Sequence, residues 1–147
     1  MDNIAYELAH SVDVDVPLSV AWTWRTDVRN WNDPPARFEL DGAFTSGSRG
    51  TTVLPGQQPL RWCIRDVQPG GSFSIEMALD DAVLVFEWQF DAVSDHQTRM
   101  TQRIVLSGRN ADAHVAQVRA NFESTVAAGM KRIADAMVDA HRKRQLN

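Results

Sequence analysis

The sequence of 147 residues contains one cysteine, Cys63, and only two lysines, Lys131 and Lys143. A single cysteine excludes an intramolecular disulfide framework and is typical of a protein in the reducing cytoplasm. No run approaches the roughly 18 consecutive apolar residues that a membrane span needs. Residues 1–10 lack a basic segment followed by an apolar one, so we expect no signal peptide and no membrane insertion.

Several other signatures of function are missing as well. The formal net charge of -4 argues against a nucleic-acid partner, because general nucleic-acid-binding domains carry a basic excess. The histidines show no spacing typical of zinc ligands, and nothing pairs them with the cysteine. Glycine-rich phosphate loops and serine-nucleophile elbows are absent. We therefore expect no metal and no cofactor.

The composition that is present is that of a folded domain. Hydrophobic residues make up 44% of the chain and charged residues 23%, which is a globular rather than a disordered balance. No linker and no second core are visible, so we expect one domain over residues 1–147.

The first segment alternates strictly between two faces. Even-numbered residues from Ile4 to Val16 share one face, and the odd-numbered residues, Asp13 among them, share the other. This period of two predicts a half-buried β-strand. Pro17 ends the strand, and residues 18–26 and 27–32 predict two short helices after it.

Residues 36–108 contain turns rich in glycine, proline, aspartate and serine, which predict six strands joined by tight connections. Each turn fixes the register of its hairpin. The pairs that follow from turns at 69–70, 80–81 and 94–95 are Ile64 with Ile75, Phe73 with Trp88, and Trp88 with Gln102. Large apolar residues of three successive hairpins thereby fall on one face, which predicts a continuous antiparallel sheet.

Residues 111–142 predict one long helix. Apolar residues recur there at spacings of three and four and draw a single stripe, formed by Val115, Val118, Phe122, Val126, Met130, Ile133 and Met137. At ~1.5 Å per residue this helix is about 45 Å long and crosses the whole sheet. The element order is therefore strand, two short helices, six strands and a long helix.

This order resembles the superfamily of START and birch-allergen-like domains (SRPBCC), also called the helix-grip fold. The local resemblance lies in Val12-Asp13-Val14 with Pro17, in Asp27–Trp31 before Asp33-Pro34, in Gly47–Gly50, and in Thr98–Thr101 leading to Gly108. It covers nearly the whole chain and is closest to the polyketide cyclase/dehydrase-like branch.

The resemblance implies an α+β helix-grip fold. In that fold a seven-stranded curved antiparallel sheet wraps around a long C-terminal helix, with two short helices between the first and second strands, and encloses an apolar cavity. Members bind lipids, sterols, polyketides and plant hormones, and only some are enzymes.

The inner face of such a sheet carries few polar groups here, as small-molecule sites usually do. We expect the ligand-binding residues to be Tyr6, His10, Trp62, Met77, Phe86, Trp88, Gln102, Phe122, Val126 and Met130. His10 is the candidate catalytic residue, because it is the only histidine on an apolar face. Alternatively, His10 and Gln102 satisfy one another in the core. The indoles of Trp22, Trp24 and Trp31 either form the cavity mouth or pack in the core.

We expect the protein to bind a small hydrophobic or aromatic, lipid- or polyketide-like molecule between the sheet and the long helix. One alternative is a metal-free polyketide cyclase/dehydratase or isomerase that uses the same cavity. It is weakened because the expected inner face holds no carboxylate and no arginine. A second alternative is a protein-interaction module, and a homodimer is left open.

Overall fold

The computed structural model describes residues 3–146. Its seven antiparallel strands form one sheet in the order β1-β7-β6-β5-β4-β3-β2. The strands are β1 (Ile4–Val14), β2 (Arg37–Leu40), β3 (Arg49–Val53), β4 (Leu60–Gln68), β5 (Ser72–Leu79), β6 (Ala82–Ser94) and β7 (Gln97–Ser107). The number of strands and their place in the element order confirm the prediction.

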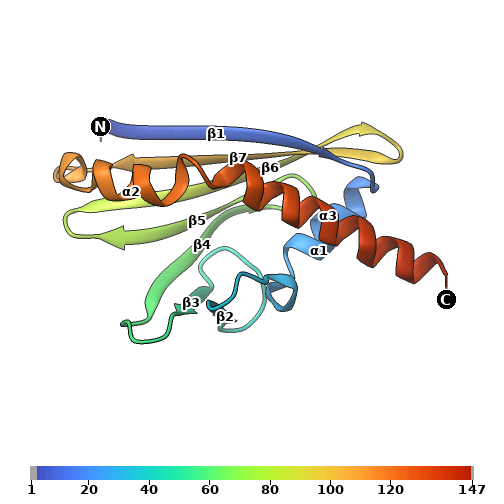
Figure 1. Cartoon of the computed structure of the whole chain (residues 1–147), viewed down its shortest axis with the longest axis horizontal. Helices are drawn as coiled ribbons and strands as arrows, with labels where there is room; N and C mark the ends of the chain where they lie inside the picture. Colours follow the sequence, from blue (N-terminus) through green and yellow to red (C-terminus); the bar gives the residue numbers. More distant parts are fainter. Residues whose placement is uncertain (1–2, 147) are drawn as a thin grey trace.

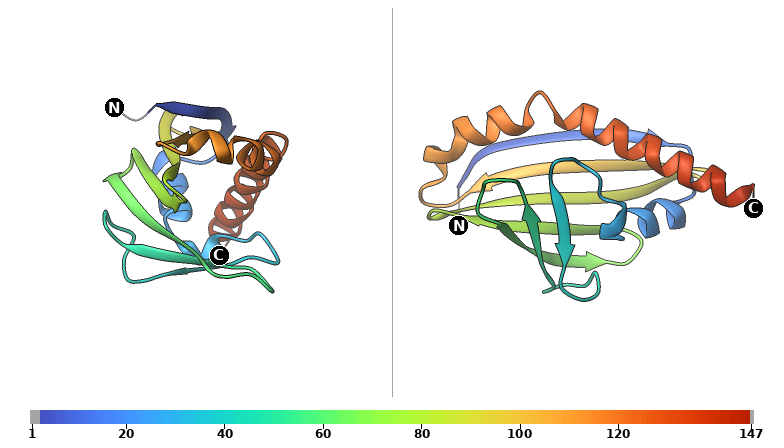
Figure 2. Two further views of the ribbon diagram at one scale, coloured as in Figure 1. Left: turned by 90° about the vertical axis from the view of Figure 1, so that its left-hand side faces the viewer. Right: turned by 60° about the horizontal axis from the view of Figure 1, so that its bottom comes forward.

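The helices lie inside the curve of this sheet. They are α1 (Leu18–Arg25), η1 (Val28–Asn30), η2 (Ala111–His114), α2 (Val115–Phe122) and α3 (Val126–Gln145). Figure 1 shows α2 and α3 running along the sheet, and the end-on view in Figure 2 shows the strands curving around them. No helix within residues 3–146 is both long enough and apolar enough to cross a membrane.

The hairpin registers agree with those predicted from the positions of the turns. Ile64 pairs with Ile75, and Trp88 pairs with Phe73 on one side and with Gln102 on the other. The β4–β5 ladder shifts register between Arg65 and Gln68, where Asp66 adopts a positive φ of 51°. Such bulges bend a strand and increase its twist, and this one lies on one of the strands that form the cavity wall.

The prediction of one unbroken helix over 111–142 is wrong in one respect. The helix is interrupted between Phe122 and Val126, and only α3 is long. The Thr125 hydroxyl donates to the Asn121 carbonyl oxygen at 2.8 Å, and the Thr125 amide bonds to the carbonyl of Phe122, three residues back. Hydroxyl side chains that bond back to the preceding turn compete with regular helical bonding and bend the chain.

The outer face of the sheet carries paired charges. Arg103 bonds to both Glu7 and Glu87, and Arg99 bonds to Asp13 at 2.8 Å. These pairs join neighbouring strands at the solvent-exposed surface and contribute modestly to stability. The apolar side chains lie on the opposite, concave face, where the candidate site is found.

Candidate functional site

A cavity of about 380 Å³ lies between the concave face of the sheet and α3. Its volume falls within the range of about 300–1,000 Å³ that is typical of small-molecule sites. The sheet contributes Phe38, Thr52, Trp62, Ile75, Met77, Phe86, Trp88 and Gln102 to its wall. This wall is apolar and aromatic, with Thr52 and Gln102 as its two polar side chains.

Trp62 is held in place on this wall by three neighbours. Its indole Nε1 donates to the Thr52 hydroxyl at 3.0 Å, and its ring stacks on Trp31 with centroids 5.6 Å apart. The ring also covers Gly50, its partner across the β3–β4 ladder. A rigid, fixed indole on this wall offers a flat apolar surface to any occupant of the cavity.

We expect Gly50→Ala to lower the free energy of unfolding by about 1–3 kcal/mol, because overpacking forces neighbours out of position. A Cβ at residue 50 would overlap the Trp62 ring, whereas a Cβ at Gly71 would meet only ordinary contacts. Urea denaturation of Gly50→Ala and of the control Gly71→Ala measures this difference. Equal stability of the two variants would show that Trp62 is free to move.

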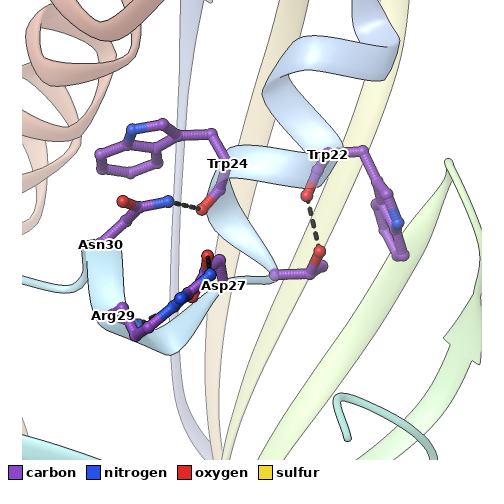
Figure 3. Close-up of polar contacts among 6 residues, drawn as sticks. Trp22, Trp24, Asp27, Arg29 and Asn30 are labelled. Carbon is purple, nitrogen blue, oxygen red and sulfur yellow. Dashed lines mark hydrogen bonds and ion pairs between the residues drawn. The ribbon is translucent and has the colours of Figure 1, made fainter.

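The turn between α1 and η1 closes one end of the cavity. The Asn30 side-chain amide donates to the Trp24 carbonyl at 2.9 Å, and the Trp31 indole donates to the Arg25 carbonyl at 2.8 Å. Figure 3 shows the first of these bonds and shows the indoles of Trp22 and Trp24 pointing to opposite sides of α1. Trp22 packs in the core, whereas Trp24 and Trp31 line the cavity. The two short elements thus present two indoles to the site.

Arg25, the last residue of α1, also lines the cavity. Its guanidinium carbon lies 4.6 Å from the ring centroid of Trp31 and 4.3 Å from that of Trp88. Desolvated cation–π contacts of this kind offset part of the cost of burying the charge. The expectation that no arginine faces inward is therefore wrong.

The guanidinium of Arg25 is otherwise uncompensated. Within the described chain, its Nε atom is buried and has no hydrogen-bond partner. The side chain as a whole is half-buried, and the part that remains accessible contributes to the cavity wall. Desolvation lowers the pKa of Arg25 to about 9, so the group still carries its charge at neutral pH.

We expect Arg25→Met to keep the unliganded protein within about 1 kcal/mol of the wild type or to stabilise it, because apolar replacements of buried charges are often neutral or favourable. Unfolding and refolding the purified protein first removes any bound molecule. Urea denaturation of the refolded protein then measures the free energy of unfolding. A loss above about 2 kcal/mol would show that the contacts with Trp31 and Trp88 outweigh the cost of burying the charge in the unliganded fold.

The third wall is one face of α3. Its lining residues recur at spacings of three and four and are Gly129, Arg132, Ile133 and Ala136. Arg132 approaches Asp33 to 4.0 Å, and both side chains are largely exposed, which places this ion pair at the mouth. Asp33 is the one carboxylate of the lining.

The structure divides the sequence-predicted site residues into two sets. Five of them line the cavity, namely Trp62, Met77, Phe86, Trp88 and Gln102. The other five lie outside its lining, namely Tyr6, His10, Phe122, Val126 and Met130. The division follows from packing, because a second apolar cluster beneath α2 contains Tyr6 and Phe122, and Met130 is buried in the main core.

The residues outside the lining have other neighbours. Tyr6 packs in that second cluster with Arg119 above its ring at 5.4 Å, and Phe122 meets Phe86 edge to face at 5.4 Å. Met130 is 1% exposed in the main core. His10 is half-buried on β1, directly opposite Gln102 of β7. A catalytic role for His10 stays a prediction.

Arg25 was not predicted as a site residue, although the sequence contains a signal for it. Leu18, Ala21, Trp22 and Arg25 recur at spacings of three and four in α1, which puts the arginine on the apolar face of the helix. Gly129 and Ile133 of α3 were missed as lining residues because the apolar stripe shows which face packs, not where packing leaves a gap.

Comparison with known proteins identifies a family that the chain matches. The sequence profile of the family described as polyketide cyclase / dehydrase and lipid transport matches residues 6–144. Among curated proteins, none matches the chain.

Solved structures share the fold over nearly the whole chain. Norcoclaurine synthase from Thalictrum flavum, a point mutant in complex with a transition-state analogue, superposes with a TM-score of 0.73 at 11% identity, covering 96% of this chain and 98% of its own. A protein from Arthrobacter aurescens gives 0.67 at 16% identity, with 93% and 91% covered. Ara h 8.0201 gives 0.70 at 11% identity, with 93% and 99% covered.

At these low identities the superpositions show the shared fold, and the profile match shows the family. The curved sheet, the long C-terminal helix and the two short helices are those expected of the helix-grip fold. The chain belongs to the polyketide cyclase/dehydrase and lipid transport family of the SRPBCC superfamily.

Proposed function

We propose that this protein binds a small hydrophobic or aromatic molecule, lipid- or polyketide-like, in the cavity between the sheet and α3. The observation that carries the proposal is the cavity of about 380 Å³ whose lining includes Trp24, Trp31, Trp62 and Trp88. Apolar surface buried against such walls contributes about 25 cal/mol per Å². The indoles of Trp31, Trp62 and Trp88 are already fixed by hydrogen bonds or stacking, so little of their side-chain entropy is lost on binding.

The polar groups of the sheet wall give the ligand an orientation. Thr52 accepts a hydrogen bond from Trp62, and its own hydroxyl hydrogen is left to donate. Gln102 lines the cavity between the neighbouring strand positions of His10 and Trp88. A ligand that left such groups unpaired would lose about 1–3 kcal/mol for each.

Binding is favoured over the enzymatic alternative by the chemistry of the lining. Proton transfer needs a titratable group within reach of the substrate. Asp33 is the one carboxyl among the lining residues, and it lies at the mouth beside Arg132. His10, the residue that the sequence suggests as acid or base, lies outside the lining.

The interaction-module alternative is not favoured either. Such a module needs a contiguous exposed apolar patch. The exposed large apolar residues of the described chain lie on separate elements and are Ile4, Leu60, Val93 and Leu146. A cytoplasmic location and the absence of a nucleic-acid partner stay predictions from the sequence.

Native mass spectrometry of freshly purified protein tests the proposal. We expect a reproducible additional mass in the small-molecule range, and denaturing extraction then identifies its chemical class. The same spectrum reports whether a homodimer forms. A clean unliganded mass, together with no change in melting temperature on adding a hydrophobic dye or a lipid panel, would contradict the proposal.

A further inference from the structure

Arg25 differs from every other arginine of the described chain. Seven others lie within 4.0 Å of a carboxylate, namely Arg29, Arg65, Arg99, Arg103, Arg109, Arg119 and Arg132. The remaining five are exposed to solvent, namely Arg37, Arg49, Arg61, Arg142 and Arg144. Arg25 alone combines an enclosed guanidinium with the lack of a carboxylate partner.

The aromatic contacts of Arg25 satisfy only part of this group. Trp31 and Trp88 lie over the guanidinium at 4.6 and 4.3 Å, and such contacts engage the planar faces of the ion. Its N–H donors point outward in that plane and need acceptors. The buried Nε has none within residues 3–146. An acceptor group on a molecule bound in the cavity would satisfy these donors.

The other polar groups around the cavity do not compete for this role. Asp33, the one carboxylate of the lining, is 70% exposed at the mouth and lies 4.0 Å from Arg132. The inner wall offers the neutral groups of Thr52, Gln102 and Asn30. A buried positive charge beside neutral donors and aromatic walls is complementary to an apolar molecule with one negative end.

We propose that the natural ligand of this cavity is a hydrophobic or aromatic monoanion, such as a carboxylate, whose charged group binds the guanidinium of Arg25. The inference rests on the proposed binding function and narrows it from apolar molecules in general to acidic ones. Arg25 supplies the charge and the N–H donors, Trp31 and Trp88 hold it in place, and the sheet wall receives the apolar skeleton.

Two fluorescent dyes test this inference as a matched pair. Anilinonaphthalenesulfonate is an apolar monoanion, and phenylnaphthylamine is the same skeleton without the sulfonate. We expect the wild type to bind the anion at least about tenfold more tightly than the neutral dye. In Arg25→Gln this ratio is expected to fall to about one, and in Arg25→Lys it is partly retained because the charge remains.

Arg142→Gln is the matched control, because it removes one positive charge from an exposed arginine outside the cavity lining and is expected to leave the ratio within about twofold of the wild type. A ratio near one in the wild type, or a ratio unchanged by Arg25→Gln, would overturn the inference while leaving the cavity as an apolar site. Gly129→Leu, which places a side chain in the cavity from α3, separates failure of this inference from failure of the proposed function. If neither dye binds the wild type, or both bind Gly129→Leu unchanged, the proposed function and the inference fall together.

Discussion

Replacing Phe73 with alanine is expected to lower the free energy of unfolding by about 3–5 kcal/mol, the range for a fully buried phenylalanine. Phe73 is 1% exposed. Its ring meets Trp22 and Phe44 edge to face at 5.9 and 4.9 Å and stacks with Trp88 at 6.3 Å. It therefore joins the sheet to α1, and its loss leaves a hole at that junction.

Far-UV circular dichroism during urea denaturation measures this effect without relying on the tryptophans. Phe38→Ala is the control, because Phe38 is half-buried and already borders the cavity. Removing a side chain beside existing empty space creates less new cavity surface, so we expect less than half the loss. If Phe73→Ala lowered the free energy of unfolding no more than Phe38→Ala does, Phe73 and its aromatic neighbours would not be the main packing centre.

Replacing Gly129 with leucine is expected to weaken binding of phenylnaphthylamine by on the order of a hundredfold, because a side chain that occupies the site excludes the ligand. Gly129 lies in α3 and lines the cavity. A Cβ there would meet only the Arg132 guanidinium, at 3.7 Å. The protein should not lose stability, because glycine inside a helix is less favourable than other residues by up to about 1 kcal/mol.

Gly129→Ala separates the helix effect from the cavity effect. It makes the same gain in helix propensity, roughly 0.5–1 kcal/mol, but adds only a methyl group to the lining. We expect this variant to be more stable than the wild type and to bind the neutral dye within about threefold of it. Equal affinity of the leucine and alanine variants would place the dye outside the cavity.

The strand registers could be predicted because they depend on local information. Turn residues fix where each hairpin closes, and a period of two then decides which side chains face inward. Trp88 therefore lies between Phe73 and Gln102, as the turns at 80–81 and 94–95 require. The interruption before α3 could not be predicted this way, because the bond from Thr125 to Asn121 does not disturb the apolar stripe.

The extent of the cavity depends on contacts between distant segments, which no local pattern contains. Tyr6 and Phe122 face inward as the alternation and the stripe predict, yet side chains under α2 fill their half of the sheet. Arg25 is enclosed only because Trp31 and Trp88, from two other segments, meet its guanidinium. The sequence showed which face each residue takes but not where the two layers leave space.

The central claim is that a ligand occupies this cavity, and the tryptophan indoles test it directly. Isotope-labelled protein gives one indole N–H resonance for each of its five tryptophans, assigned by single Trp→Phe variants. We predict that saturating amounts of the extracted ligand, or of anilinonaphthalenesulfonate, shift the resonances of the four lining residues, Trp24, Trp31, Trp62 and Trp88. The resonance of the core residue Trp22 is expected to shift less. Saturation that leaves those four resonances in place would contradict the account.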